Sequence, residues 1–214
     1  KNKMLNEILI AIIYSLFFYI LGCIPTSYLL GKNLFKIDIL DKDSRHSGLS
    51  NIYNLLPKKY IFLILFIDVI MKGFLPTLFI QLFDSKLLFI VIFLLIGHNW
   101  SIFINLRGGK GITVAIGIIL GVSYMLFVYL LSLFILIWLI NRFRDSAFPW
   151  IISFFSLTFI VNMNFLGDDY NTYGLILLLL CFLILIRRSL GITNYNKVNY
   201  KIIINRILFD RENS

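Results

Sequence analysis

The chain has 214 residues, of which 59% are hydrophobic and only 14% are charged, and its mean hydropathy is +0.89. A soluble domain carries about 25% charged residues, so this composition excludes an ordinary water-exposed surface and indicates that lipid covers much of the protein. The net charge of +9 would favour nucleic acid as a partner in a soluble protein. Here the basic residues lie between hydrophobic runs, which favours membrane lipids instead and predicts no nucleic-acid partner.

Seven apolar runs follow one another along the chain. A helix needs about 20 apolar residues to cross the hydrocarbon core, and fewer where flanking side chains reach the interface. The expected spans are Met4–Leu30, Tyr60–Phe83, Leu87–Leu106, Ile112–Val122, Tyr124–Ile140, Phe148–Leu166 and Leu175–Ile186. The runs are continuously apolar rather than alternating, which favours helices over barrel strands. We therefore predict an all-α integral membrane protein, a seven-transmembrane-helix bundle that forms a single transmembrane domain over residues 1–214.

The distribution of Lys and Arg predicts the orientation of this bundle. Sixteen of the 20 Lys and Arg residues fall in the connections after the first, third and fifth spans and in the tail; three fall on the other side and one, Lys72, lies inside the second span. Basic loops stay in the cytoplasm, so the N-terminus is expected outside and the C-terminus inside. The cytoplasmic segments are then residues 31–59, 105–111, 141–147 and the tail 187–214.

The sharpest local motif is the run Arg107-Gly108-Gly109-Lys110-Gly111, just before the fourth span. Three glycines let backbone N–H groups approach a ligand closely, and the following helix presents its positive N-terminal end. Together with the two basic side chains, this pattern predicts an anion site suited to phosphate. The alternative is a basic turn at the membrane edge that touches lipid headgroups. The motif is not a Walker A loop, because Gly111 stands where that loop has Ser or Thr.

A second polar string lies in the first cytoplasmic connection. Its hydroxyl, amide and imidazole groups could donate to phosphate oxygens. The residues concerned are Ser44, His46, Gly48, Ser50 and Asn51. The alternative is an ordinary polar turn that caps the next helix, and the residues alone do not favour the binding site over it.

Three ionisable residues lie well inside predicted spans, away from the ends of the apolar runs. Asp68 and Lys72 are four residues apart, so they share one face of the second span and are expected to pair. Groups of this kind usually face a bundle interior or a wet cavity, although a purely structural ion pair is the alternative. His98, in the third span, could orient a substrate or transfer a proton, or it could be a hydrogen-bonded core histidine. Neither cysteine has a neighbour in the sequence that could ligate a metal, so we expect both to be small apolar packing residues and expect no metal site.

Four sequence blocks together resemble the PlsY-type glycerol-3-phosphate acyltransferases. They are Gly22–Lys32, Ser44–Asn51, Asp68–Pro76, and Gly97-His98 followed by Arg107–Gly111. The resemblance spans nearly the whole chain. It implies a bacterial inner-membrane enzyme with seven helices, the N-terminus outside and the active site on the cytoplasmic side, in agreement with the topology expected above.

The resemblance also implies a reaction and a set of site residues. The acyl group of an acyl phosphate would pass to the 1-hydroxyl of glycerol 3-phosphate, giving lysophosphatidic acid and phosphate for phospholipid synthesis without a cofactor. Gly108–Gly111 would bind the phosphate of glycerol 3-phosphate, and Ser44–Asn51 would bind the acyl-phosphate side. The substrate-binding residues would also include Asp68, Lys72, His98, Arg107 and Arg142. Asp68 and Lys72 would form the polar floor of the site. The candidate catalytic residues are Ser44, His98 and Lys110. We expect a monomer.

Two alternatives stay open. Asn54 stands where the family has an arginine, and Tyr200 and Ile203 stand at its functional His and Asn positions, which favours a catalytically altered or inactive paralogue. A small-molecule or anion transporter would explain Asp68 and Lys72 as part of a polar pathway. Against transport, the sequence has no internal repeat and no pair of interrupted spans in corresponding halves.

Overall fold

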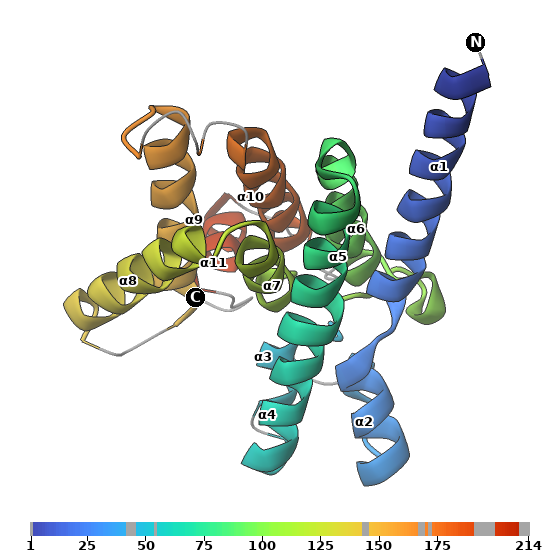
Figure 1. Ribbon diagram of the computed structural model, residues 1–214. Helices are drawn as coiled ribbons and strands as arrows, with labels where there is room; N and C mark the ends of the chain where they lie inside the picture. Colours follow the sequence, from blue (N-terminus) through green and yellow to red (C-terminus); the bar gives the residue numbers. More distant parts are fainter. Residues whose placement is uncertain are drawn as a thin grey trace. The chain divides into compact units, whose positions relative to one another are not determined.

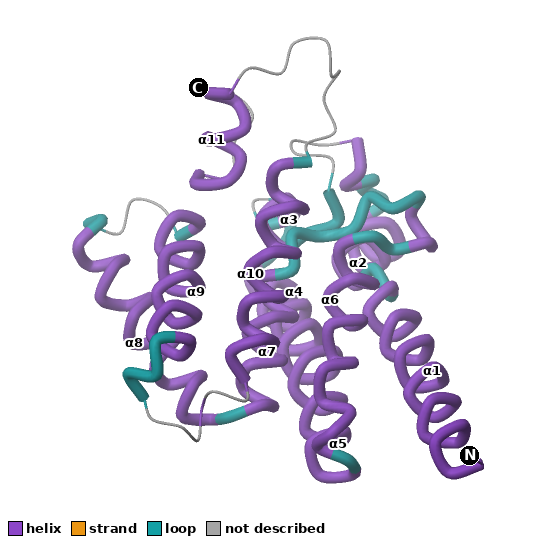
Figure 2. Tube along the Cα trace, turned by 90° about the horizontal axis from the view of Figure 1, so that it is seen from above, coloured by secondary structure: helices purple, strands orange, loops and turns teal. Residues whose placement is uncertain are grey.

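The computed structural model describes residues 2–41, 46–53, 55–142, 146–166, 170, 173–190 and 200–209. Every regular element within these ranges is helical (Figures 1 and 2). The chain packs as two compact units, residues 1–122 and 123–214. The prediction of an all-α protein is thereby confirmed for the described residues, whereas the single domain expected over 1–214 stays a prediction.

The first apolar run forms two helices rather than one. Helix α1 (Asn2–Cys23) ends just before Ile24-Pro25, and α2 (Thr26–Phe35) begins just after it. Proline has no N–H to donate, and the residue before it is driven out of the α conformation, so the helix cannot continue through Pro25. Figure 1 shows α1 and α2 as separate blue helices joined at this break. The helix of the span expected over 4–30 is therefore interrupted at Pro25, although the stretch Lys3–Phe35 as a whole is long and apolar enough to cross a membrane.

The second run forms one long helix with an expanded middle. It consists of α4 (Lys58–Phe66), a π-helical segment η2 (Ile67–Phe74) and α5 (Leu75–Phe83). A π-helical stretch changes the register of the side chains and is frequently found at functional sites. Both ionisable residues of the span, Asp68 and Lys72, lie in η2.

Shorter elements complete the first unit. The third run begins with a 3₁₀ segment and breaks after α6, and the polar connection after α2 contains two short helical turns. These elements are η1 (Ile39–Asp41), α3 (Leu49–Ile52), η3 (Ser85–Val91), α6 (Ile92–Asn99), η4 (Ile102–Ile104) and α7 (Ile112–Val122). The expected bounds of the fourth span, Ile112–Val122, are confirmed.

Two glycine pairs bring helices of the first unit into backbone contact. Where α1 crosses α6, a methyl group on Gly22 would overlap the Leu94 carbonyl, and one on Gly97 would overlap the Tyr19 carbonyl. Where η2 crosses α7, a Cβ on Gly73 would lie 2.6 Å from the Val114 carbonyl oxygen. Small residues at such crossings allow the two backbones to approach closely, and the resulting van der Waals contacts favour helix association in lipid. Both crossings lie beside residues of the candidate site.

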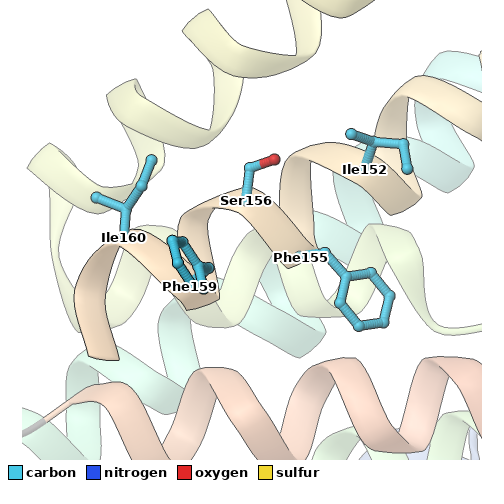
Figure 3. A pocket seen from close by; sticks show the side chains of 5 residues that line it. All are labelled: Ile152, Phe155, Ser156, Phe159 and Ile160. Carbon is cyan, nitrogen blue, oxygen red and sulfur yellow. The ribbon is translucent and has the colours of Figure 1, made fainter. Parts of the chain in front are cut away.

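The second unit consists of four helices, α8 (Tyr124–Ile140), α9 (Ala147–Asn162), α10 (Gly174–Ser189) and α11 (Tyr200–Phe209). Helix α9 packs against α8, α10 and α11. Between α8 and α9 the rings of Phe134 and Trp150 stack with centroids 4.0 Å apart. Helix α9 also lines an open apolar hollow of about 470 Å³, formed by Ile152, Phe155, Ser156, Phe159 and Ile160 (Figure 3). None of the predicted site residues lies in this hollow.

Helix length and surface composition agree with a lipid environment. Three helical stretches are long and apolar enough to cross a membrane when the short breaks within them are included: Lys3–Phe35, Lys58–Phe83 and Ser85–Ile104. The apolar helices α7, α8 and α9 are shorter. Large apolar side chains such as Phe62, Leu82 and Ile140 are more than two-thirds exposed, an arrangement that water would oppose and lipid permits. The number of seven spans stays a prediction.

Candidate functional site

The Gly-rich loop, residues 107–111, folds over the C-terminal end of α6. The Gly109 N–H donates to the His98 carbonyl oxygen at 3.0 Å. A methyl group on Gly108 would overlap the His98 carbonyl, and one on Gly109 would overlap the His98 imidazole. A side chain at position 108 would therefore push the loop away from α6, whereas one at position 109 would force either the loop or the His98 ring to move. Gly111 has a φ of +82°, in the left-handed region where a side chain is strained, and α7 begins at the next residue.

The polar string of the first connection meets this loop. The Ser47 N–H donates to the Arg107 carbonyl oxygen at 3.2 Å, and a Cβ on Gly48 would lie 3.5 Å from Gly109 Cα. Asn51 fixes the string internally, since its Nδ2 donates to the carbonyl oxygens of Ile39 at 2.7 Å and His46 at 2.8 Å. Two motifs some sixty residues apart in sequence thus lie side by side. Their meeting is the feature that makes this region a candidate binding site.

Positive charge borders this meeting point. The Arg107 side chain is exposed and that of Lys110 is half-buried, while His46 and Asn51 are buried and Ser50 is exposed. Backbone N–H groups of a Gly-rich loop, the positive end of α7 and two cations form an arrangement that can hold an anion such as phosphate. Ser44 lies outside the described residues, so its predicted role stays a prediction.

Asp68 and Lys72 form the ion pair expected from their spacing. Their side chains are 2% exposed, and Lys72 Nζ lies 2.6 Å from Asp68 Oδ1. The ammonium also donates to the Ile24 carbonyl oxygen at 2.6 Å, and the Thr26 hydroxyl donates to the same carboxylate oxygen at 3.0 Å. A buried charge of this kind persists only when it is paired and hydrogen-bonded. His98, at the end of α6, is 8% exposed.

The last predicted site residue, Arg142, belongs to the second unit. It follows α8, its side chain is exposed, and its φ is +52°. Its predicted part in substrate binding stays a prediction. Among the described residues, no group of three or more His, Cys, Asp and Glu side chains is placed to hold a metal ion.

Sequence reasoning missed two hydroxyls beside the site. The Thr26 hydroxyl bonds Asp68, and the buried Ser101 hydroxyl donates to the carbonyl oxygen of Cys23. Pro25 is the one signal that could have pointed to them, because a proline inside an apolar run leaves backbone carbonyls without their usual helical donors.

Residues 12–197 of the chain match the family model described as glycerol-3-phosphate acyltransferase. The chain belongs to this family. The resemblance inferred from the four sequence blocks is confirmed. The family model covers the whole Gly-rich loop, the polar string and the Asp68–Lys72 pair.

Individual members of the glycerol-3-phosphate acyltransferase family align over most of the chain. The glycerol-3-phosphate acyltransferase of Prochlorococcus marinus (strain NATL1A) is 32% identical over 177 residues, covering 81% of this chain and 88% of that protein. The one from Staphylococcus haemolyticus (strain JCSC1435) is 27% identical over 182 residues, covering 80% and 87%.

A solved structure shares the fold. The crystal structure of PlsY (YgiH), an integral membrane glycerol 3-phosphate acyltransferase, in its glycerol 3-phosphate form superposes with a TM-score of 0.71 at 25% identity, covering 83% of this chain and 88% of that one. Its lysophosphatidic acid form gives a TM-score of 0.70 at 26% identity. The helical integral membrane fold expected from the sequence is thus confirmed.

Proposed function

We propose that the protein is an acyl-phosphate:glycerol-3-phosphate acyltransferase, which transfers an acyl group from acyl phosphate to the 1-hydroxyl of glycerol 3-phosphate. The observation that carries the proposal is the contact between the polar string 46–51 and the Gly-rich loop 107–111. Family membership supports the same conclusion, because it supplies the class of reaction for which two adjacent phosphate-binding segments are useful.

Each segment has a chemical role in this proposal. Gly108–Gly111, with Lys110 and Arg107, bind the phosphate of glycerol 3-phosphate through positive charge and through backbone N–H groups of the loop other than that of Gly109, which donates to His98. The string that includes His46, Gly48, Ser50 and Asn51 binds the acyl-phosphate side. The glycerol 3-phosphate hydroxyl is then held close to the acyl carbon, and this positioning supplies much of the acceleration.

The transfer needs no covalent enzyme intermediate. The 1-hydroxyl oxygen attacks the acyl carbon, the bond between that carbon and the phosphate oxygen breaks, and phosphate departs with the bonding electron pair. The hydroxyl proton passes to a phosphate oxygen, so lysophosphatidic acid and inorganic phosphate are the balanced products. Cations near the reacting groups stabilise the negative charge that develops on the acyl oxygen and the leaving phosphate. Ser44, His98 and Lys110 remain the candidates for direct contact with the reacting atoms.

Topology and assembly complete the proposal. The protein spans the inner membrane of a bacterium seven times as a monomer, with its N-terminus outside and its active site facing the cytoplasm. The strong asymmetry of Lys and Arg between the two sides supports this orientation. Glycerol 3-phosphate, which is charged and water-soluble, would enter from the cytoplasm, whereas the acyl chain would extend sideways into lipid.

The decisive experiment is an assay of the purified full chain in lipid nanodiscs with palmitoyl phosphate and glycerol 3-phosphate. We expect lysophosphatidic acid with palmitoyl phosphate and none with palmitoyl-CoA. A chain that forms no product with either donor contradicts the proposal and favours the inactive paralogue. Product from palmitoyl-CoA alone would contradict the proposed donor.

Lys110→Ala tests the assignment of the Gly-rich loop. Removing a charge-assisted contact to phosphate should raise the KM for glycerol 3-phosphate about 10- to 100-fold. The matched control is Lys86→Ala, which removes an exposed lysine in η3. If Lys110→Ala and Lys86→Ala gave the same KM as the unmodified chain, the phosphate would not bind at this loop.

A further inference from the structure

The break in the first apolar run leaves two backbone carbonyls that need donors from elsewhere. Helix α1 ends at Cys23 and α2 begins at Thr26. Pro25 interrupts the helical ladder because it has no N–H. The Ile24 carbonyl keeps only a local bond, from the Thr26 N–H at 3.0 Å. Inside a membrane protein such carbonyls must be satisfied by other groups of the protein, since lipid offers no donors.

Side chains from two other elements satisfy these carbonyls. Lys72 of η2 donates to the Ile24 carbonyl oxygen at 2.6 Å, and Ser101, which follows α6, donates to that of Cys23. Lys72 is held in turn by Asp68, which also accepts from the Thr26 hydroxyl. We call this arrangement the joint: residues 23–26 together with Asp68, Lys72 and Ser101. The side chains of Cys23, Thr26, Asp68, Lys72 and Ser101 are at most 7% exposed, whereas Ile24 and Pro25, which contribute their backbone, are exposed and half-buried, respectively.

The Gly-rich loop is attached to one side of the joint. Ser101 begins the turn that leads into the loop, and its own carbonyl oxygen accepts from the N–H groups of Leu106 at 2.8 Å and Ile104 at 3.3 Å. The Ser101 hydroxyl therefore ties the start of this turn to the end of α1. A shift of Ser101 away from Cys23 would move the loop relative to α1.

The polar string is attached to the other side through α2. A Cβ on Gly31 of α2 would lie 3.0 Å from Ile39 Cγ2 and 3.3 Å from Ile52 Cδ1. These two isoleucines flank the string, and Asn51 within it donates to the Ile39 carbonyl oxygen. Because α2 starts at Thr26, the Asp68–Lys72 pair fixes the direction in which α2 leaves the joint. The joint is thus a common anchor for both halves of the candidate site.

We propose that Lys72 and Ser101 are positioning residues, which set the spacing between the polar string 46–51 and the Gly-rich loop 107–111 through the carbonyls of Ile24 and Cys23. Lys72 does this without touching substrate, since its ammonium is buried and is already bonded to a carboxylate and a carbonyl. The proposal rests on the proposed function for its activity readout and replaces the substrate-contacting role that the sequence predicts for Lys72.

The first test compares two serine-to-alanine variants of the full chain in nanodiscs. Ser101→Ala removes the bond to Cys23, while Ser153→Ala removes an equally buried hydroxyl that bonds only the Pro149 carbonyl of its own helix. We expect Ser101→Ala to raise the KM for glycerol 3-phosphate about five- to tenfold, the effect of one lost hydrogen bond, with a Tm close to that of Ser153→Ala. Ser101→Thr keeps the hydroxyl and should restore the KM.

The second test separates positioning from stability at the ion pair. Lys72→Met leaves a buried carboxylate uncompensated and should lower the Tm, whereas the double variant Asp68→Leu/Lys72→Met removes both charges and should recover it. If the Asp68–Lys72 pair only stabilises the fold, the activity of the double variant should recover together with its Tm. If Lys72 acts by positioning, the double variant should keep a KM for glycerol 3-phosphate that is raised at least fivefold, because the Ile24 carbonyl still lacks the Lys72 donor.

The outcomes distinguish this proposal from the proposed function. An active chain whose Ser101→Ala and double variants have unchanged KM overturns the positioning role and leaves the proposed function intact. A chain that is inactive but binds glycerol 3-phosphate overturns the proposed function alone, and the same variants are then compared by their dissociation constants. A chain that binds no glycerol 3-phosphate overturns both. If Ser101→Ala does not fold, Ser101→Thr and the double variant still decide the question.

Discussion

Gly109→Ala is a direct probe of how the Gly-rich loop sits on α6. The alanine Cβ would overlap His98 Nε2 and would lie 3.0 Å from Cδ2 and 3.1 Å from Cε1 of the same ring. Carbon atoms prefer a separation of about 3.5–4.0 Å, so the loop must lift or the ring must turn by on the order of 1 Å. Lifting the loop breaks the bond from the Gly109 N–H to the His98 carbonyl.

The size of the effect follows from these two losses. Overpacking costs about 1–3 kcal/mol, and the lost backbone hydrogen bond costs about 1 kcal/mol. If about 2 kcal/mol of this falls on substrate binding, the KM for glycerol 3-phosphate rises roughly 30-fold. The assay is lysophosphatidic acid formation from palmitoyl phosphate at varied glycerol 3-phosphate, with the Tm measured on the same samples.

Gly48→Ala is the matched control, because its Cβ would have no neighbour closer than 3.5 Å and its backbone, at φ −81° and ψ 160°, accepts alanine. Because Gly48 belongs to the string proposed to bind the acyl-phosphate side, this comparison is made on the Tm, which Gly48→Ala should leave unchanged. Adding His98→Ala to Gly109→Ala removes the ring that the methyl group meets. The glycerol 3-phosphate affinity of this double variant should therefore equal that of His98→Ala alone. Equal damage from Gly48→Ala and Gly109→Ala, or a wild-type KM for Gly109→Ala, would refute the reasoning.

Two further predictions concern stability. Gly117→Ala places a methyl group against the Val69 carbonyl and 2.8 Å from Gly73 Cα. Because these backbone atoms cannot turn aside, the variant should destabilise the protein by about 1–3 kcal/mol, measured as a lower Tm in detergent. An unchanged Tm would contradict the close crossing of η2 and α7. Asn51→Asp keeps the shape of the side chain but loses both hydrogen bonds that Asn51 donates to the Ile39 and His46 carbonyls. Amide hydrogen exchange at residues 46–52 should therefore accelerate about tenfold or more. Exchange at the wild-type rate would show that these two bonds do not hold the polar string.

The sequence could predict the elements whose ends are marked by composition. The boundary between Val122 and Tyr124 is such a case, because Ser123 interrupts the apolar run and its hydroxyl caps α8 by accepting from the Leu126 N–H. The bounds of α7 and α8 agree with the expected spans for this reason. The ion pair of η2 was equally predictable, because a spacing of four residues places two side chains on one helical face.

The break at Pro25 could not be predicted from composition in the same way. Hydropathy records only whether side chains favour lipid, and Ile24 and Pro25 are both apolar, so the run continues although its hydrogen bonds do not. The meeting of Ser47 with Arg107 is likewise a tertiary contact that no local pattern encodes. The resemblance of the two motifs to one family suggested that they act together, but it could not specify which backbone groups join them.

Lys72 lies inside a span and pairs with Asp68 as the sequence predicts, but the structure gives it a different role. An ionisable residue at membrane depth is expensive, and the general expectation is that it marks a substrate or ion pathway. Here the expense is offset within the protein, because the ammonium has a carboxylate partner and a carbonyl that the proline break deprives of its helical donor. A charged donor suits this task better than a neutral one, since charge-assisted hydrogen bonds are about twice as strong. The Lys72 ammonium, which the sequence assigns to substrate binding, is therefore better placed to hold the bend between α1 and α2. Both the polar string and the Gly-rich loop are attached to this bend.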